Sequence, residues 1–371
     1  MKRRSNLYDS MLDYEKIKKI YNKVRVTTKN KKEVMRFSLN LNENLMDILT
    51  KLYKGKYVFN NYRIFLIKEP KYRLIMSECI EDKMVNHLLS DELIKYLERC
   101  LIDNNVATRK NKGSKQAYNE FIKGINKLMY KSKDIYVLKL DISKYFYNIN
   151  HKILMDMVME KIKDKKVLYL LKQILDTTNK SYVNKEIREV FYKEKKRIKA
   201  LNISKEEKMK LYKELDKIPT YKEGYGLPIG NMSSQILAVF FLNKVDHFIK
   251  EVLKCKNYIR YMDDLVVIDT DYNKLKEYKK IITKEIEKYD LKVNEKSSIV
   301  KLRSGVNFLG YNFKINKKLI IKYRKDTIKR INKKIINLFI YDINYLFRSY
   351  ASYKGYFIMC NTSVRDKYLS D

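Results

Sequence analysis

Asp263 and Asp264 are two adjacent carboxylates set between two runs of aromatic and β-branched residues. The runs cover residues 258–259 and 265–268, and this pattern predicts a tight β-hairpin with both acids at its tip. Neighbouring carboxylates repel one another, and burial adds to the cost, so a pair held at a fixed turn calls for a cation. Oxygen ligands at such a point suit Mg²⁺. The alternative is an exposed Asp-Asp turn with no metal.

Asp141 supplies a third acid far from the other two in the chain. It closes a strand predicted over residues 135–142, and an acid at the end of an apolar strand is costly unless it is paired or binds metal. The segment that follows turns into an aromatic helix and reaches His151, which we interpret as a structural or capping residue outside the chemistry.

Residues 224–235 contain the densest turn signal in the chain, with three glycines and one proline. They lead directly into a helix predicted over 236–253. A flexible glycine loop before a helix allows close backbone approach to a sugar, base or phosphate.

Two basic groups precede the acids. Lys71 ends a turn at residues 68–71 between two predicted strands, and Arg73 follows it; side chains two apart on a strand share a face. Together they could grip a polyphosphate, although a solvated edge strand would have the same pattern. Arg109 belongs to a second basic cluster, just before a helix predicted over 116–129, a position suited to phosphate.

The remaining elements form a mostly helical frame. Helices are predicted over 8–57, 80–101 (amphipathic) and 274–289, and a hairpin over 306–313 with Gly310 at its turn. Residues 177–222 are rich in Lys and Glu, which predicts solvated helices inserted outside the core. Arg260 is interpreted as structural or as a backbone contact.

The composition favours a nucleic-acid partner. The chain has 371 residues and a formal charge of +37, and phosphate neutralisation with counterion release drives sequence-independent affinity for nucleic acid. No apolar run approaches the length of a membrane span, so no membrane association is expected. Four scattered cysteines and a start without a secretory signal predict free thiols and a cytoplasmic location.

The order of these features resembles the palm of a reverse transcriptase. Asp141 matches the acid of the first palm motif, and Tyr261-Met262-Asp263-Asp264 matches the third. Residues 226–235 match the second motif, and residues 308–311 match the primer-grip region. The resemblance covers the chain from about residue 62 to its end.

The resemblance implies a two-metal site. Asp141, Asp263 and Asp264 would be catalytic and would bind two Mg²⁺ ions, or Mn²⁺, about 3.5–4 Å apart, with the backbone carbonyl of Ile142 as a further ligand. The ions would activate a primer 3′-hydroxyl and neutralise the triphosphate during in-line displacement.

The resemblance also implies nucleotide and primer contacts. The expected nucleotide-binding residues are Lys71, Arg73, Arg109, Phe146, Gln235 and Lys296. Among them, Phe146 would exclude ribonucleotides and Lys296 could protonate pyrophosphate. The expected template and primer contacts are Gly226, Pro228, Gly230, Leu309, Gly310 and Tyr311.

The implied function is RNA-directed DNA synthesis from dNTPs on a DNA or RNA primer with an RNA template, with a dedicated non-coding RNA or accessory protein as a further partner. Ile229-Gly230-Asn231 and Ser234-Gln235 are similar to bacterial or phage enzymes of diversity-generating retroelements and antiviral defence, rather than to group II intron or retron enzymes. The alternatives are a template-independent DNA polymerase, an RNA-dependent RNA polymerase and an RNA-binding scaffold with an inactive palm.

The expected fold is α+β, a right-hand polymerase with an antiparallel palm sheet flanked by helices. The expected division is an N-terminal helical extension (1–60), fingers (61–133), a palm (134–311) with the insertion at about 177–222, and a basic helical thumb (312–371).

Overall fold

The computed structural model describes residues 6–68, 71–341, 343–357 and 359–361. It divides into two compact units, each built from separate stretches of the chain. One unit combines the chain up to Asp103 with Ile142–Phe248 and Lys284–Lys292, and the other combines Asn104–Asp141, Ile249–Thr283 and the chain from Val293 onwards. Helices and antiparallel sheets make up both units, so the predicted α+β class is confirmed. Glu69 and Pro70, the centre of one predicted turn, and the last residues of the predicted thumb lie outside the described residues.

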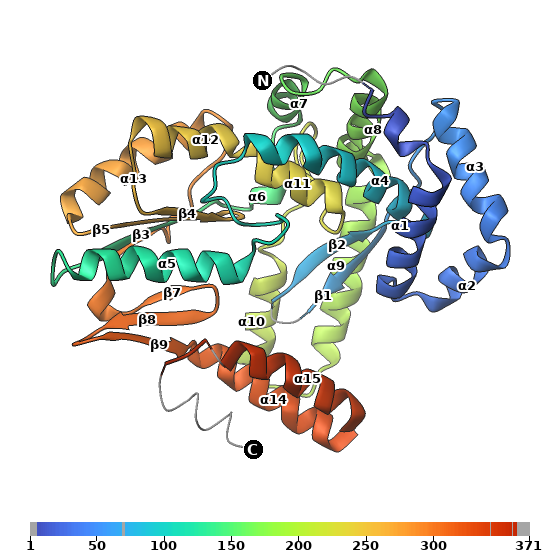
Figure 1. Ribbon diagram of the computed structural model, residues 1–371. Coiled ribbons are helices and arrows are strands. Elements are labelled where there is room, and N and C mark those ends of the chain that lie inside the picture. The colour runs from blue at the N-terminus through green and yellow to red at the C-terminus, as the bar shows by residue number, and fades with distance from the viewer. Residues whose placement is uncertain (1–5, 69–70, 342, 358, 362–371) are drawn as a thin grey trace. The chain divides into compact units, whose positions relative to one another are not determined.

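The first unit is mostly helical and carries one two-stranded sheet (Figure 1). Its elements are η1 (Asp9–Met11), α1 (Tyr14–Thr27), α2 (Lys31–Leu39), α3 (Leu41–Tyr53), β1 (Arg63–Ile67), β2 (Arg73–Ser77), α4 (Ile80–Leu97), η2 (Glu98–Cys100), α6 (Tyr145–Asn148), α7 (His151–Met159), α8 (Lys165–Asp176), η3 (Thr177–Asn179), α9 (Ser181–Ala200), α10 (Lys205–Leu215), α11 (Met232–Phe241) and α12 (Asn243–His247).

The second unit holds two antiparallel sheets and the C-terminal helices. Its elements are α5 (Ser114–Met129), β3 (Tyr136–Asp141), β4 (Tyr258–Tyr261), β5 (Asp264–Asp269), β6 (Ser298–Lys301), η5 (Leu302–Ser304), β7 (Val306–Phe308), β8 (Tyr311–Ile315), β9 (Leu319–Tyr323), α14 (Lys325–Tyr341) and α15 (Ile343–Phe357). A π-helix, η4 (Phe248–Val252), and helix α13 (Tyr272–Glu287) continue from one unit into the other.

The four-stranded sheet of the second unit has the order β4-β5-β3-β6. Strands β5 and β3 occupy its centre. Residues 265–268 of β5 are all buried, and since successive side chains of a strand point to opposite faces, both faces of β5 are covered. Strand β3 pairs antiparallel with both neighbours, so the acid at its end lies next to the acid that begins β5.

Helix α5 lies between this sheet and the three-stranded sheet β7-β8-β9 (Figure 1). On the side of the four-stranded sheet, Gly124 allows α5 to approach β5 closely, because a Cβ atom there would lie 3.2 Å from Ile268 Cδ1. On the other side the ring of Phe121 packs against Phe308 and Phe313, with centroids 5.0 and 4.7 Å away. Both sheets therefore share one core through α5, and α14 and α15 pack against each other beyond β9.

Helix α4 is buried on nearly all sides, which differs from the predicted amphipathic helix. Helices α1 and α11 both pack against it, so polar positions such as Asp82, Asn86 and Glu92 are also buried. A helix enclosed by neighbours needs no solvent-facing side. The helix ends at Leu97, and a short 3₁₀ turn follows where the helix was predicted to continue to residue 101.

Helices α9 and α10 form the Lys- and Glu-rich stretch, which is helical as predicted. More than half of their residues are exposed, but α9 also packs on β1 and β2 and buries four of its side chains: Val183, Ile187, Glu194 and Ile198. The helix predicted over 236–253 is divided into α11, α12 and η4, and it starts earlier, at Met232.

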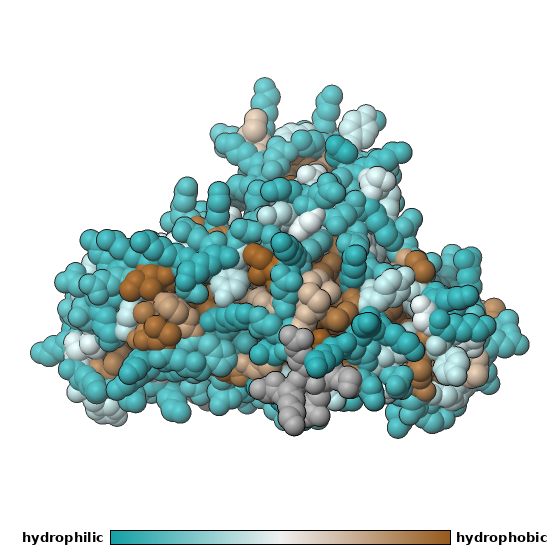
Figure 2. Space-filling view, turned by 90° about the horizontal axis from the view of Figure 1, so that it is seen from above, coloured by the Kyte–Doolittle hydropathy of each residue, from teal (hydrophilic) through white to brown (hydrophobic). Residues whose placement is uncertain are grey.

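Hydrophilic side chains cover most of the face shown in Figure 2, and hydrophobic side chains form separate patches between them. In the described part of the chain, no helix has both the length and the apolar character needed to cross a membrane.

Candidate catalytic site

Asp141 and Asp264 meet across the centre of the four-stranded sheet. They are direct partners in the β3–β5 register, so their side chains leave the same face of the sheet. Strand β4 pairs with β5 so that Tyr261 faces Asp264, which leaves only Met262 and Asp263 in the turn. The predicted hairpin is therefore confirmed, with Asp263 at its tip beside the other two acids.

The Met262–Asp263 turn has a strained backbone and is held by a hydrogen bond from Arg260. Met262 has a φ of 57°, a left-handed conformation that a non-glycine residue rarely adopts. The side chain of Arg260 is fully buried, and its Nη1 donates a hydrogen bond of 2.9 Å to the carbonyl oxygen of Met262. Arg260 thus contacts backbone, as predicted, and it holds the turn that carries Asp263.

A second turn, at residues 294–297, fixes Asp141. Asn294 donates two hydrogen bonds to it: the side-chain amide to Oδ2 at 2.9 Å and the backbone N–H to the carbonyl oxygen at 2.7 Å. The backbone N–H of Asp141 in turn donates to Ser297 Oγ at 3.0 Å. Backbone and carboxylate of Asp141 are therefore both held by one segment.

Lys139 and Lys296 lie near Asp141 and Asp264. Lys139 Nζ lies 3.1 Å from Asp264 Oδ1, and it lies two residues before Asp141 on the same strand face. Lys296 is exposed. Both line a cavity of about 380 Å³ together with Asp141 and Asp264. The lining of the cavity thus combines two acidic and two basic side chains.

The acids perturb one another's ionisation. Burial raises the pKa of Asp263 to about 6, and the neighbouring charges of Asp264 and Asp141 add to the rise. Burial and the charge of Asp264 also raise the pKa of Asp141, against the lowering effect of the Asn294 hydrogen bond. Both shifts mean that the site disfavours the ionised carboxylates, through burial first and through the neighbouring negative charge second.

The donor set fits a hard divalent cation. All three candidate ligands offer carboxylate oxygen, and their mutual repulsion is the condition that a cation would relieve. Within the described ranges, no three Asp, Glu, His or Cys side chains form an assembled metal cluster. Lys139 occupies one oxygen of Asp264 at 3.1 Å, so a cation at that oxygen would have to displace the ammonium.

Arg109 belongs to the same unit as the acids. Its loop is joined to β4 by two backbone hydrogen bonds, from Arg260 N–H to Asn104 O and from Val106 N–H to Arg260 O. Thr108 Oγ1 then contacts Met262 Sδ at 3.7 Å. The loop that carries Arg109 therefore runs beside the Asp263 turn.

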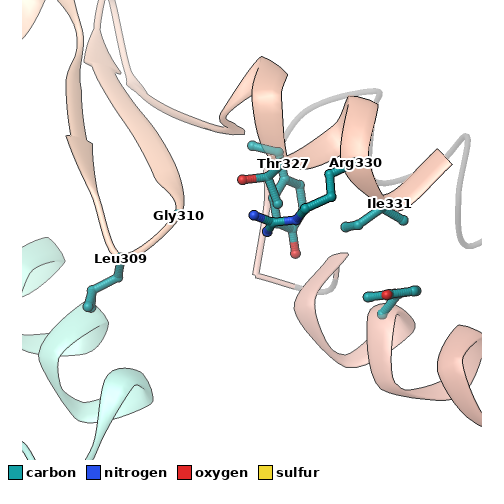
Figure 3. A pocket seen from close by; sticks show the side chains of 7 residues that line it. Leu309, Gly310, Thr327, Arg330 and Ile331 are labelled. Atoms are coloured by element: carbon teal, nitrogen blue, oxygen red, sulfur yellow. The ribbon is translucent and has the colours of Figure 1, made fainter. Parts of the chain in front are cut away.

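The predicted hairpin at 306–313 is formed by β7 and β8, with Leu309 and Gly310 both at positive φ, as a type I′ turn requires. A cavity of about 330 Å³ separates this turn from α14, and Arg330 extends into that space (Figure 3). Tyr311 is different: its side chain is buried and packs against Tyr118 and Tyr323, so it is part of the core.

The other predicted residues lie in the first unit, where the 226–235 loop brings several of them together. Leu227 N–H donates to Phe146 O at 2.7 Å, and Gly226 N–H donates to Ile149 O at 2.8 Å. His151 Nε2 lies 2.7 Å from Gly226 O, which supports its interpretation as a structural residue. Pro228 is buried, and Ile142 directly follows Asp141 with its side chain buried.

The end of the same loop is joined to β2. Met76 N–H donates to Ile229 O at 2.8 Å, and a Cβ on Gly230 would lie only 2.5 Å from Met76 O. Gln235 follows in the first turns of α11 and is half-buried. Lys71 and Arg73, at the other end of β2, are both exposed.

Sequence reasoning missed Lys139, Asn294 and Ser297 as parts of the site. From the segment that holds Asn294 and Ser297 only Lys296 was predicted to belong to the site, and nothing in the sequence indicates that this segment contacts Asp141. Lys139 had a usable signal, since its spacing of two from Asp141 places both on one strand face.

The family model for reverse transcriptase (RNA-dependent DNA polymerase) matches residues 67–313. The chain belongs to the reverse transcriptase family. The family is one of nucleotidyltransferases, and the matched range contains Asp141, Asp263, Asp264 and the 226–235 loop. Reverse transcriptase domains generally use divalent metal ions, in agreement with the donor set described above. A comparison with curated proteins gave no match.

Among solved structures, this reverse transcriptase chain is similar to telomerases from two yeasts. Telomerase from Candida albicans, solved in complex with a fragment of telomeric RNA, is 14% identical with a TM-score of 0.43, over 73% of this chain and 46% of that chain. Apo telomerase from Candida tropicalis, truncated from its C-terminal domain, is 17% identical with a TM-score of 0.44, over 76% and 60%. The chain thus spans about half the length of these proteins.

Proposed function

We propose that this reverse transcriptase is an RNA-directed DNA polymerase that extends a primer 3′-hydroxyl with dNTPs. The observation that carries the proposal is the pairing of Asp141 with Asp264, with Asp263 in the adjoining turn, beside a cavity rimmed by Lys139 and Lys296. This arrangement concentrates acids where a divalent metal would be needed and cations where phosphate would lie.

Asp141, Asp263 and Asp264 are the proposed metal ligands, with the backbone carbonyl of Ile142. Two Mg²⁺ ions held there would lower the pKa of the primer 3′-hydroxyl and neutralise the transferring phosphate and leaving pyrophosphate. Asn294 and Ser297 hold Asp141 in place for this role, and Arg260 holds the turn of Asp263. Preorganisation of this kind avoids reordering the ligands during the reaction.

Several cationic side chains are proposed to bind the incoming triphosphate: Lys71, Arg73, Arg109 and Lys296, of which Lys296 would also protonate pyrophosphate. Phe146 and Gln235 are proposed to contact the sugar and base, with Phe146 selecting deoxyribonucleotides. The backbone at Gly226, Pro228 and Gly230, together with Leu309, Gly310 and Tyr311, is proposed to contact template and primer. For Tyr311 the burial of its side chain limits this contact to its backbone.

The proposed branch of the reverse transcriptase family rests on the sequence. The residues Ile229-Gly230-Asn231 and Ser234-Gln235 support a bacterial or phage enzyme of the diversity-generating or antiviral-defence kind, with a dedicated RNA or accessory protein as partner. Four free cysteines support a reducing, cytoplasmic location. The division into N-terminal extension (1–60), fingers (61–133), palm (134–311) and thumb (312–371) is part of the same proposal.

Primer extension tests the function. Purified protein is incubated with Mg²⁺ and a labelled primer on an RNA template, with dNTPs in one arm and NTPs in another, and a third arm omits the template. Template-dependent dNTP incorporation is expected. Incorporation of NTPs would indicate an RNA polymerase, products without template would indicate a template-independent polymerase, and RNA binding without any incorporation would indicate a scaffold.

A further inference from the structure

The two faces of strand β2 have different surroundings. Tyr72, just before the strand, and Leu74 and Met76 within it are buried, whereas Lys71 and Arg73, on either side of Tyr72 in sequence, are exposed. Alternate residues of an extended segment point to opposite faces. The face opposite Lys71 and Arg73 is therefore the packed face of the hairpin.

Helix α9 covers that packed face. Val183 and Ile187 of α9 join a core cluster with Leu74 and Met76 of β2. Farther along α9, Ile198 joins Tyr72 and Leu215 of α10 in a second cluster. The helical pair α9–α10 thus follows β2 from its C-terminal end to the tip of the hairpin.

Glu194 lies at the tip, buried on the inner side of α9 with 6% of its side chain exposed. Tyr72 Oη donates to its Oε1 at 2.7 Å, and Lys68 Nζ lies 2.8 Å from its Oε2. Arg197, one turn further along α9, donates from Nε and Nη2 at 2.6–3.0 Å. One buried carboxylate therefore joins α9 to residues on both sides of the hairpin turn.

Two cationic side chains and one neutral hydroxyl surround the single carboxylate of Glu194. Burial alone would raise the pKa of Glu194, but hydrogen bonds from Arg197, Lys68 and Tyr72 outweigh it and lower the pKa to about 2. A buried carboxylate with charged and neutral donors in several directions is held more rigidly than an apolar contact, because charge-assisted hydrogen bonds are directional. This carboxylate therefore holds Lys68 and Tyr72, which belong to the two arms of the hairpin.

We propose that α9 is a positioning element for substrate binding: through Glu194 it holds Tyr72 and Lys68 and so sets the position of Lys71 and Arg73. The inference rests on the proposed function, in which Lys71 and Arg73 bind the incoming triphosphate. Glu194 is a positioning residue that touches no substrate. Lys68, although basic and adjacent, serves this cluster rather than the triphosphate.

Three variants test the proposal. Glu194→Gln keeps the shape of the side chain and removes its charge, and Tyr72→Phe is a milder change that keeps the ring and removes only the hydroxyl donor. Glu189→Gln is the matched control, because Glu189 lies exposed on the same helix. For each protein, single-nucleotide primer extension gives KM for dNTP and kcat, and hydrogen exchange reports on the amides of β1 and β2.

Glu194→Gln and Tyr72→Phe should raise KM for dNTP by roughly tenfold, a typical effect of losing a hydrogen bond to a charged group, with kcat and primer–template affinity within about twofold of wild type. Hydrogen exchange should quicken in β1 and β2 only, and Glu189→Gln should match wild type. An unchanged KM in folded Tyr72→Phe and Glu194→Gln would overturn the proposal, and so would an equal loss in kcat.

The experiments distinguish a failure of the proposed polymerase function from a failure of the proposed positioning role of α9. If wild-type protein incorporates no nucleotide, the proposed function fails, and hydrogen exchange alone decides the positioning role of α9. Unchanged exchange in β1 and β2 of both variants would then contradict it, and faster exchange confined to these strands would support it.

Discussion

Asp141 and Asp264 are cross-strand partners at the centre of an antiparallel sheet. The pairing converts two acids that are far apart in the chain into neighbours on one face, and the two-residue turn adds Asp263. Like charges directly opposite one another destabilise a sheet, so the sequence retains them at a cost to stability. A bound cation would offset that cost.

Replacing Asn294 by Ala should lower the rate of nucleotide incorporation by about tenfold, because the carboxylate of Asp141 loses its amide donor at 2.9 Å. The backbone bond from residue 294 stays, so the fold should persist and primer–template binding should not change. Single-turnover primer extension measures the effect. Asn126→Ala, at an exposed position of α5, is the control, and equal rates in the two variants would show that Asn294 has no part in positioning Asp141.

Replacing Lys139 by Met should tighten the binding of a divalent cation by roughly fivefold, since an ammonium 3.1 Å from Asp264 competes with the cation for the same oxygen. Binding of Mn²⁺ measured by calorimetry tests this without relying on activity. Lys127→Met removes an equal charge from the exposed side of α5 and should leave the affinity unchanged. Weaker Mn²⁺ binding in Lys139→Met would contradict the prediction.

Gly230 and Gly224 should respond differently to Ala. A Cβ at Gly230 would lie 2.5 Å from the carbonyl oxygen of Met76, and its φ of +142° adds strain, so Gly230→Ala should cost about 2–5 kcal/mol of stability. Gly224 has a φ of +74° with nothing within 4 Å, so Gly224→Ala should cost only about 1–2 kcal/mol. Urea denaturation compares them, and equal losses would mean that the loop does not approach β2 this closely.

Glu78 should make the stability depend on pH. Burial raises its pKa to about 8 from an ordinary 4.5, although Tyr62 Oη and Asn86 Nδ2 donate hydrogen bonds to its carboxylate. The folded protein therefore keeps a proton that the unfolded chain has lost, so this contribution is complete below about pH 4.5 and is lost as the pH rises to about 8.

Glu78→Gln should remove that dependence and stabilise the protein at pH 8 by a few kcal/mol, at about 1.4 kcal/mol for each pKa unit. Chemical denaturation at pH 5 and pH 8 measures it. Glu43→Gln, exposed on α3, should retain the wild-type slope. A slope unchanged in Glu78→Gln would show that Glu78 is ionised in the folded protein at neutral pH.

The sequence was sufficient to predict the elements whose structure follows from a local residue pattern. Runs of aromatic and β-branched residues on both sides of a short turn predicted the hairpin at Asp263, a second hairpin was predicted at Gly310, and the family resemblance grouped Asp141 with Asp263 and Asp264. The chain order of these motifs, rather than any one of them, carried that inference, because an adjacent pair of acids alone is compatible with an exposed turn.

Features that depend on tertiary packing could not be predicted. The contact of Asn294 with Asp141 joins residues more than 150 positions apart. In α9, only four inward positions are buried in 20 residues, and one of them is Glu194, so the apolar periodicity is too weak to distinguish a packing helix from a solvated one. Helix α4 was predicted to have a solvent-facing side, but its polar side chains are buried because α1 and α11 pack against it.

The central claim, that the carboxylates of the β4–β5 hairpin bind the metal used in DNA synthesis, is tested most directly by Asp263→Asn. Asp269→Asn is the matched control, because it makes the same change at the other end of β5, where Asp269 pairs with Lys274 at 2.8 Å. The measurement is dNTP incorporation on a primed RNA template with Mg²⁺, alongside the affinity for that template. We predict that Asp263→Asn abolishes incorporation and leaves RNA affinity within about twofold, while Asp269→Asn keeps both; polymerisation retained in Asp263→Asn would contradict the account.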